Sequence, residues 1–280
     1  MLPPGTEELI GIAFREDLGD GDHTTLSTIP ADARGTARLL VKEPGVLAGM
    51  ELAVAVAKHL DPDLSIKPFL LDGARVQPGD VAFTITGSSR SILSVERVLL
   101  NFMQRMSGIA TLTERYVKAV EGTGCRVLDT RKTTPGMRAV EKWAVQIGGG
   151  HNHRSGLYDM VMIKDNHVDF AGGIAPAIAA ARKYLFEKQK ELAIEVETRN
   201  LDEVKEVLRV GGVQRIMLDN FDPERMKEAV KLIGKRFETE ASGGIDLSTA
   251  RTYAETGVDF ISVGALTHSV HSLDLSLKAM

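Results

Sequence analysis

Residues 192–244 decide the fold, and they read LAIEVETRNLDEVKEVLRVGGVQRIMLDNFDPERMKEAVKLIGKRFETEASGG. Short, largely apolar runs alternate here with amphipathic helical stretches; the runs are 192–196, 214–218 and 237–241, and the helical stretches are 201–209 and 223–233. Buried strands that alternate with helices form parallel sheets with right-handed crossovers. This stretch therefore predicts an α/β fold.

The same alternation extends outward on both sides. Further strand-like runs occur at 125–129, 159–163 and 259–263, and a further helical stretch at 247–255. Six strands are fewer than the eight of a complete α/β barrel. We therefore expect an incomplete α/β barrel.

Before residue 100 the elements are mixed. Residues 34–42 indicate a strand, 54–60 a helix, and Gln77-Pro78-Gly79-Asp80 a turn between two further strand-like runs. Residues 91–106 form a long helical pattern that leads into the second half. An α+β domain with an antiparallel sheet is expected here.

Charge is unevenly distributed along the chain. The formal net charge is -4, but residues 97–164 contain 11 Lys or Arg against 5 Asp or Glu, a local balance of +6. A basic centre in an acidic protein favours small anionic substrates, and the overall charge favours neither nucleic acid nor an acidic membrane as partner.

Cys125 is the single cysteine, so an intrachain disulfide is excluded and a reducing compartment is expected. The first nine residues lack the basic flank and apolar core of a signal peptide. The most apolar window, 46–57, contains Glu51 and is too short to span a bilayer. These features predict a cytoplasmic protein without a membrane segment.

Polar or glycine residues follow every predicted strand of the second half. In parallel α/β barrels the catalytic residues lie at these strand ends. In chain order they are Arg131 and Lys132; Lys164 and Asp165; Glu197; Asp219 and Asn220; Ser242, Gly243 and Gly244; and Gly264. Cations come first, acids next and glycines last.

This order predicts a site for a phosphorylated anion. Four cations would bind carboxylate or phosphate, namely Arg131, Lys132, Arg154 and Lys164. Glu197 and Asp219 are suitable oxygen ligands for Mg²⁺. Ser242, Gly243 and Gly244 precede a helix start, where backbone N–H groups bind phosphate.

Each of these residues taken alone has a structural explanation, as a solvated charge, a helix cap or a tight turn. Their shared position at one rim favours the functional interpretation. His151 and His153 have the spacing of a metal pair, but no histidine occurs between His167 and His268 to complete a barrel metal site. An anion-binding role next to Arg154 is the preferred interpretation for His153.

Two segments are specific enough to indicate a family: Arg131-Lys132-Thr133-Thr134-Pro135-Gly136 and His151-Asn152-His153-Arg154. Together with other segments in order along the chain, they resemble quinolinate phosphoribosyltransferase. The others are 16–19, 21–25, 96–97 with 100–101, 107–111, 129–130, 163–167, 195–197, 218–220, 241–245 and 263–268.

The resemblance implies a small N-terminal α+β sandwich domain, residues 1–106, followed by an α/β barrel of about seven strands, residues 107–265. Residues 266–280 are expected to rejoin the first domain, with 273–277 as a strand. The seventh barrel strand has no clear candidate in the sequence. A homodimer is also implied, in which Arg97 enters the partner's site.

The resemblance further implies a role for each matching residue. Arg97, Arg131, Lys132, His153 and Arg154 would bind the carboxylates of quinolinate, and Thr130 would be a further substrate-binding residue. Lys164, Glu197 and Asp219 would act at the ribose, with Mg²⁺ at the two acids. Ser242, Gly243, Gly244, Gly264 and His268 would bind the phosphate groups of phosphoribosyl pyrophosphate.

Three alternatives remain open. A related phosphoribosyltransferase would act on another acidic base or on nicotinate. A class I aldolase would form a Schiff base at Lys164, which leaves the arginines unexplained. A non-catalytic anion-binding protein would not need Glu197 and Asp219.

Overall fold

The computed structural model describes residues 2–280, and contacts within the chain define two compact units. The first comprises residues 2–114, 133–149 and 266–280, and the second comprises residues 115–132 and 150–265. Helix α4, Ser89–Ala119, continues from the first unit into the second. No helix within residues 2–280 is both long and apolar enough to cross a membrane.

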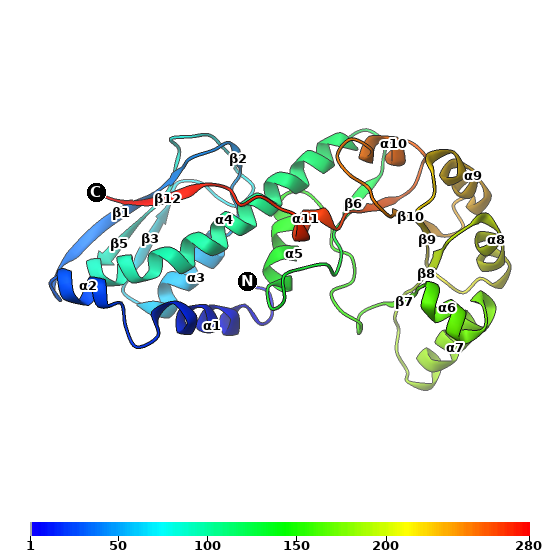
Figure 1. Cartoon of the computed structure of the whole chain (residues 1–280), viewed down its shortest axis with the longest axis horizontal. Coiled ribbons are helices and arrows are strands. Elements are labelled where there is room, and N and C mark those ends of the chain that lie inside the picture. Colours follow the sequence, from blue (N-terminus) through cyan, green and yellow to red (C-terminus); the bar gives the residue numbers. More distant parts are fainter. Residues whose placement is uncertain (1) are drawn as a thin grey trace. The chain divides into compact units, whose positions relative to one another are not determined.

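The first unit contains a four-stranded antiparallel sheet in the order β12-β1-β5-β3. Its strands are β1 (Arg34–Val41), β3 (Ser65–Pro68), β5 (Val81–Ser88) and β12 (Leu275–Ala279). The C-terminal strand β12, red in Figure 1, pairs with β1 from Ala37↔Ala279 to Val41↔Leu275. The chain end therefore returns to the first sheet, with β12 two residues later than the expected strand at 273–277.

Helices and a short ribbon complete the first unit. They are α1 (Thr6–Leu18), α2 (His23–Thr28), α3 (Met50–Leu60), α5 (Arg138–Ile147) and the ribbon of β2 (Gly45–Val46) with β4 (Arg75–Val76). The core includes Leu39 and Phe83 of the sheet and Leu52 and Val56 of α3, all without exposed surface. The expected turn at residues 77–80 lies between β4 and β5.

The second unit contains a six-stranded sheet, and all its strand pairs are parallel. Its order is β6-β11-β10-β9-β8-β7, and the strands are β6 (Arg126–Leu128), β7 (Val161–Ile163), β8 (Ile194–Thr198), β9 (Arg215–Asp219), β10 (Glu238–Ser242) and β11 (Phe260–Ser262). Each predicted strand-like run overlaps one of these strands, although β8, β9 and β10 end one or two residues later than predicted, and the predicted α/β class is confirmed.

The seventh strand position is reduced to a single bridge. His151 pairs in parallel with Leu128 of β6, on the edge that β11 leaves open. The His151 N–H donates to the Val127 carbonyl at 2.8 Å, and the Asp129 N–H donates to the His151 carbonyl at 3.1 Å. With this bridge, seven chain segments follow one another in barrel order.

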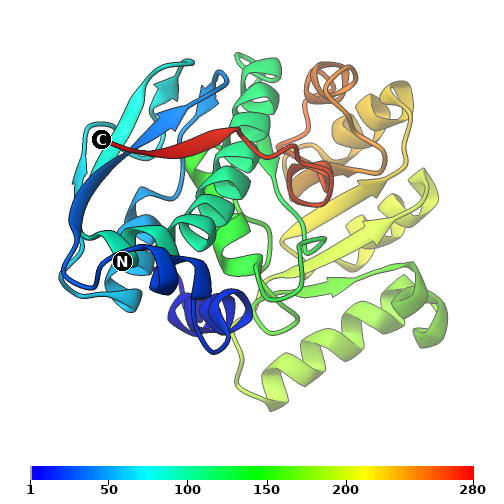
Figure 2. The same cartoon turned by 60° about the vertical axis from the view of Figure 1, so that its left-hand side comes forward.

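Helices lie along the outer side of this sheet (Figures 1 and 2). They are α6 (Asp165–Ala171), α7 (Ile174–Glu187), α8 (Leu201–Val210), α9 (Pro223–Ile233) and α10 (Ala250–Ala254), and the four-residue α11 (Ala265–His268) follows β11. Predicted and observed helices agree closely for α8 and α9. Helix α10 is shorter than the expected 247–255 because Asp246 forms a turn with Ser248 and Thr249.

Local sequence signals explain where α8 and α9 begin. The Asn200 side chain accepts hydrogen bonds from the N–H groups of Asp202 and Glu203. Asp222 accepts from the Arg225 N–H, and Pro223 occupies the first helical position. These caps satisfy N–H groups that lack a partner within the helix, so they fix both helix starts directly after β8 and β9.

Candidate active site

The carboxyl ends of the parallel strands collect twelve of the expected site residues in the second unit. Thr130, Arg131 and Lys132 follow β6, and His153 and Arg154 follow the His151 bridge. The others lie at or directly after the ends of β7 to β11: Lys164, Glu197, Asp219, Ser242, Gly243, Gly244 and Gly264. Because the strands are parallel, these ends share one edge of the sheet.

Two arginines form the cationic part of this edge. Arg131 is exposed, whereas Arg154 is half-buried and donates from its guanidinium to the Met160 carbonyl at 3.2 Å. Burial lowers the pKa of Arg154, and the charge of Arg131 lowers it further. The two cations therefore act on each other in a partly desolvated place, which an anionic ligand would stabilise.

Lys164 and Glu197 form an ion pair between neighbouring strands. Lys164 Nζ lies 2.8 Å from Glu197 Oε2, and the Glu197 side chain is almost fully buried while that of Lys164 is 45% exposed. The Lys164 N–H donates to His167 Nδ1 at 3.0 Å, which fixes the turn into α6. The pair places a cation next to a carboxylate at the carboxyl ends of β7 and β8.

Asp219 accepts hydrogen bonds from the last residue of β10 and from the residue that follows β9. Ser242 Oγ donates to Asp219 Oδ1 at 2.7 Å, and Asn220 Nδ2 donates to Asp219 Oδ2 at 2.6 Å. Gly243 closes the arrangement with a φ of 96°, and a Cβ there would lie 2.2 Å from Asn220 Oδ1. Glycine is required at this position because the β10 loop approaches Asn220 so closely.

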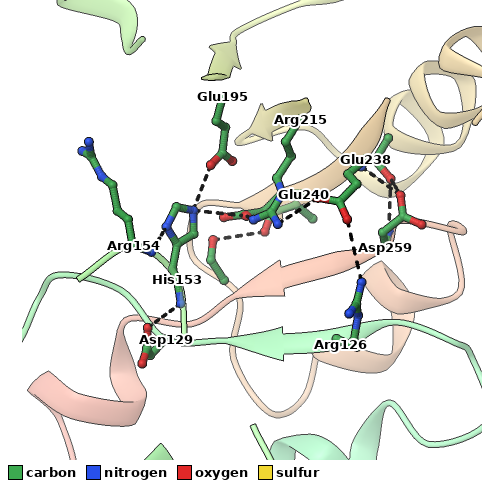
Figure 3. A network of polar contacts seen from close by, with 12 residues as sticks. Arg126, Asp129, His153, Arg154, Glu195, Arg215, Glu238, Glu240 and Asp259 are labelled. Carbon is green, nitrogen blue, oxygen red and sulfur yellow. Dashed lines mark hydrogen bonds and ion pairs between the residues drawn. The ribbon is translucent and has the colours of Figure 1, made fainter. Parts of the chain in front are cut away.

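A buried cluster surrounds the imidazole of His153 (Figure 3). His153 Nε2 lies 3.0 Å from Glu195 Oε2 and 3.4 Å from Glu240 Oε2, and neither glutamate has exposed side-chain surface. Arg215 Nη1 lies 2.8 Å from Glu240 Oε2. On the other side of the ring, the Arg154 N–H donates to His153 Nδ1 at 2.6 Å.

The charges of His153, Glu195 and Glu240 depend on one another because the three side chains are buried together. Burial opposes charge on His153, but the neighbouring carboxylates outweigh it and raise the pKa of His153 to about 9. Burial, followed by the charge of Glu240, raises the pKa of Glu195. Burial also opposes charge on Glu240, but His153 and Arg215 outweigh it and lower its pKa.

The sequence interpretation missed Glu195, Arg215 and Glu240, although a signal was present. We treated 192–196, 214–218 and 237–241 as largely apolar runs, yet Glu195 alternates with Glu197 and Glu238 with Glu240. The sheet register pairs Arg215, the one charge of the middle run, with both Glu195 and Glu238. Strands that are apolar on both faces lack such alternation. Charge with a period of two therefore indicates one polar, buried face.

Arg97 and His268 belong to the first unit. Arg97 is an exposed residue of α4, and His268 ends α11 with its Nδ1 2.6 Å from Ser269 Oγ. Their expected contacts with substrate stay predictions.

A separate cavity of about 310 Å³ lies beside the ends of β8 and β9. Its lining residues include Arg199, Lys205 and Arg225, whose charges are matched by nearby acids, as in the Arg199 pair with Glu203 at 2.7 Å. None of the expected catalytic residues lines it. We do not place the chemistry there.

Strand ends that carry cations, paired acids and a glycine loop define an α/β enzyme for phosphorylated, anionic substrates. Family models for the C-terminal and N-terminal domains of quinolinate phosphoribosyl transferase match residues 109–278 and 22–107, respectively. The chain belongs to the quinolinate phosphoribosyltransferase family.

Relatives resemble the chain over nearly its full length. A chloroplastic, carboxylating nicotinate-nucleotide pyrophosphorylase of Arabidopsis thaliana is 50% identical, covering 96% of this chain and 81% of the relative. The carboxylating enzyme of Mycobacterium leprae is 43% identical, covering 95% and 94%. The crystal structure of NadC from Streptococcus pyogenes has a TM-score of 0.92 at 40% identity, covering 98% and 96%.

Proposed function

We propose that this protein transfers the phosphoribosyl group of phosphoribosyl pyrophosphate to quinolinate, releasing pyrophosphate and carbon dioxide and producing nicotinate mononucleotide for NAD biosynthesis. The names of the relatives describe this chemistry. The observation within the structure that carries the proposal is the pair Arg131 and Arg154, because two cations, one of them half-buried, follow adjacent segments at the same edge of the sheet.

Quinolinate carries two carboxylates, and burying an unpaired carboxylate costs several kcal/mol. Arg131, Lys132 and Arg154 at one sheet edge would supply the opposite charge, and guanidinium groups bind carboxylates in a bidentate fork. Quinolinate needs cationic partners for two carboxylates, whereas nicotinate has one carboxylate and needs fewer. The local excess of basic residues fits the doubly charged substrate better.

In the first chemical step, the pyridine nitrogen attacks the anomeric carbon of the ribose as the bond to pyrophosphate breaks. Positive charge develops on the ribose before the new C–N bond is complete. Glu197 and Asp219 are fixed by Lys164, Ser242 and Asn220, so their carboxylates would stabilise that charge without rearranging. The Ser242 to Gly244 loop and Gly264 would bind phosphate through backbone N–H groups.

In the second step, the ring nitrogen is cationic and withdraws electrons from the adjacent carbon. The bond to the neighbouring carboxylate breaks, carbon dioxide leaves, and the electron pair that remains on the ring carbon takes up a proton. No covalent intermediate with the protein is needed. Lys164 is held in an ion pair by Glu197, whereas a Schiff-base lysine acts as a neutral amine, so the aldolase alternative finds no support.

Mg²⁺ is a further part of the proposal. Glu197 and Asp219 supply carboxylate oxygens on neighbouring strands, and Mg²⁺ typically takes one or two protein carboxylates and completes its shell with water and substrate phosphate. The donor chemistry of this pair fits the ion. When bound, Mg²⁺ would neutralise charge on the departing pyrophosphate.

The assembly and the compartment also stay proposals. A homodimer with Arg97 contributed to the partner's site is consistent with the exposed position of Arg97 on α4. A cytoplasmic location was expected from the sequence, but plant relatives are named as chloroplastic or mitochondrial.

The test is to incubate the protein with quinolinate, phosphoribosyl pyrophosphate and Mg²⁺, and to measure pyrophosphate and carbon dioxide together. Equal amounts of both products are expected, with nicotinate mononucleotide as the third product. Parallel reactions contain nicotinate in place of quinolinate. Pyrophosphate release with nicotinate but not with quinolinate would assign the protein to a related phosphoribosyltransferase instead.

A further inference from the structure

Arg105 of α4 and Glu141 of α5 form a buried ion pair within the first unit. Arg105 Nη2 lies 2.8 Å from Glu141 Oε1, and Arg105 Nε donates to the same oxygen at 3.0 Å. The Glu141 side chain has no exposed surface, and that of Arg105 is 23% exposed. A buried carboxylate is stable only where a partner matches its charge and further donors satisfy its remaining lone pairs. The second oxygen of Glu141 is therefore informative.

That oxygen holds the segment that directly follows the cations of the motif at 131–136. Glu141 Oε2 accepts the Thr134 N–H at 3.1 Å. In the same segment, Arg138 Nε donates to Thr133 Oγ1 at 3.0 Å. Helix α5 thus supplies a polar partner to each of the two threonines of this motif. The expected quinolinate-binding cations are joined through these threonines to a buried anchor.

The guanidinium of Arg105 also reaches the segment after β11. Its Nη2 donates to the Thr267 carbonyl, directly before His268, which is expected to bind phosphate. The preceding residue of α4 holds the continuation of this segment, because the Gln104 carbonyl accepts the Leu273 N–H at 3.0 Å. One turn of α4 therefore anchors the chain on which His268 lies.

We propose that Arg105 and Glu141 are positioning residues for two substrate-binding segments. Glu141 fixes the quinolinate-binding segment through the Thr134 N–H. Arg105 fixes the phosphate-binding segment through the Thr267 carbonyl, and the ion pair joins the two. A buried ion pair adds little net stability compared with a well-packed apolar pair, so the gain here lies in fixed geometry. The proposal rests on the proposed function, which places quinolinate at the first segment and phosphate at the second.

The variant Glu141→Gln tests the first of these tasks. Glutamine keeps one acceptor oxygen, which the charged Arg105 takes, and its NH₂ group cannot accept the Thr134 N–H. KM for quinolinate should therefore rise about tenfold at saturating phosphoribosyl pyrophosphate, the effect of losing one hydrogen bond to a charged group. KM for phosphoribosyl pyrophosphate should change less than about twofold, because Arg105 still reaches Thr267.

The variant Arg105→Lys should show the opposite pattern. Lysine keeps a positive charge beside Glu141, but a single ammonium lacks the fork that reaches Glu141 and Thr267 together. KM for phosphoribosyl pyrophosphate should rise about tenfold, and KM for quinolinate less than about twofold. The contact of Arg105 Nη2 with Thr134 Oγ1 is long, at 3.4 Å, so its loss affects the quinolinate-binding segment little.

The matched control is Asp72→Ala, which destabilises the first unit at another place. Asp72 Oδ1 accepts the Met50 N–H at the start of α3, at 2.9 Å. Urea unfolding is measured for all three variants, and the control should keep both KM values close to those of wild type. A crossed pattern of KM values supports positioning. Parallel rises of both KM values in Glu141→Gln and Arg105→Lys, or unchanged values in both, would overturn the proposal.

Hydrogen exchange tests the arrangement without turnover. The Thr134 amide should exchange about tenfold faster in Glu141→Gln than in wild type, because its acceptor is lost, and Arg105→Lys should change this rate less. An unchanged rate in Glu141→Gln would overturn the role of Glu141. If wild type converts neither substrate, the proposed function fails instead, and the exchange rate still tests whether Glu141 holds this segment.

Discussion

At the scale of single residues, the half-buried Arg154 is the most informative side chain of the site. Its charge lies in a desolvated place beside the charge of Arg131, so both cations are expected to pair with substrate carboxylates. Changing Arg131 or Arg154 to alanine should reduce transition-state stabilisation by roughly 2–5 kcal/mol, because a buried carboxylate then lacks its partner. The measurement is kcat/KM for quinolinate.

An exposed arginine serves as the control for these variants. Arg209 lies in the last turn of α8. The Arg209→Ala variant also loses one guanidinium charge, but it leaves the residues at the strand ends unchanged. The Arg209→Ala variant should keep kcat/KM close to that of wild type. Near-normal turnover by Arg154→Ala would remove the main physical support for a dicarboxylate substrate.

The single cysteine gives a prediction about pH. Burial, and secondarily the charge of Asp259, raises the pKa of the Cys125 thiol to about 12, from an ordinary value of 9.0. Between about pH 9 and pH 12 the unfolded chain loses this proton while the folded chain keeps it, so this contribution to the free energy of unfolding falls as pH rises. The slope from this one group is at most about 1.4 kcal/mol per pH unit.

The same contribution is absent from a Cys125→Ala variant. Denaturant unfolding at pH 8.0 and at about pH 10 should show that wild type loses more stability than the variant over this interval. A thiol reagent at pH 8 should label the folded protein slowly and the unfolded protein at once. Parallel pH profiles of the two proteins would contradict the burial effect on Cys125.

At the scale of elements, the loop after β10 contains two adjacent glycines with different demands. Both have left-handed φ values, 96° at Gly243 and 61° at Gly244, so alanine is strained at either position. At Gly244 a Cβ would meet open space, whereas at Gly243 it would lie 2.2 Å from Asn220 Oδ1. Gly244→Ala should cost about 1–2 kcal/mol of stability, and Gly243→Ala roughly 3 kcal/mol or more because overpacking adds to the strain.

Urea unfolding of the two alanine variants measures this difference directly. Since Asn220 also holds Asp219, Gly243→Ala should in addition raise KM for phosphoribosyl pyrophosphate more than Gly244→Ala does. Equal stability of the two variants and equal KM for phosphoribosyl pyrophosphate would show that the close approach of Gly243 to Asn220 does not hold Asp219 in place.

The same elements show what the sequence permits one to predict. Six strands and the helices α8 and α9 were predictable because periodicity and caps act locally. The reduced strand at His151 was not, since a single bridge has no periodic pattern. Glu195 and Glu240 were also missed, because a buried carboxylate is stable only beside His153 and Arg215, which lie far away in sequence.

At the scale of the whole molecule, Arg97 is the expected site residue through which the proposed homodimer can be tested. The resemblance implies that Arg97 of one subunit completes the site of the other, and Arg97 is exposed on α4 in the single chain. Composition and periodicity describe one chain and carry no signal for such an exchange. Complementation between inactive variants is therefore the decisive experiment.

In a dimer with exchanged arginines, an Arg97→Ala subunit and a Lys164→Ala subunit together form one intact site and one site with both defects. A purified heterodimer should thus regain up to about half of the wild-type activity, although each homodimer is weakly active. The matched control combines Arg154→Ala with Lys164→Ala, two changes in the same unit, and should regain nothing because every site keeps one defect. If the first heterodimer also stays inactive, Arg97 acts within its own chain or not at all.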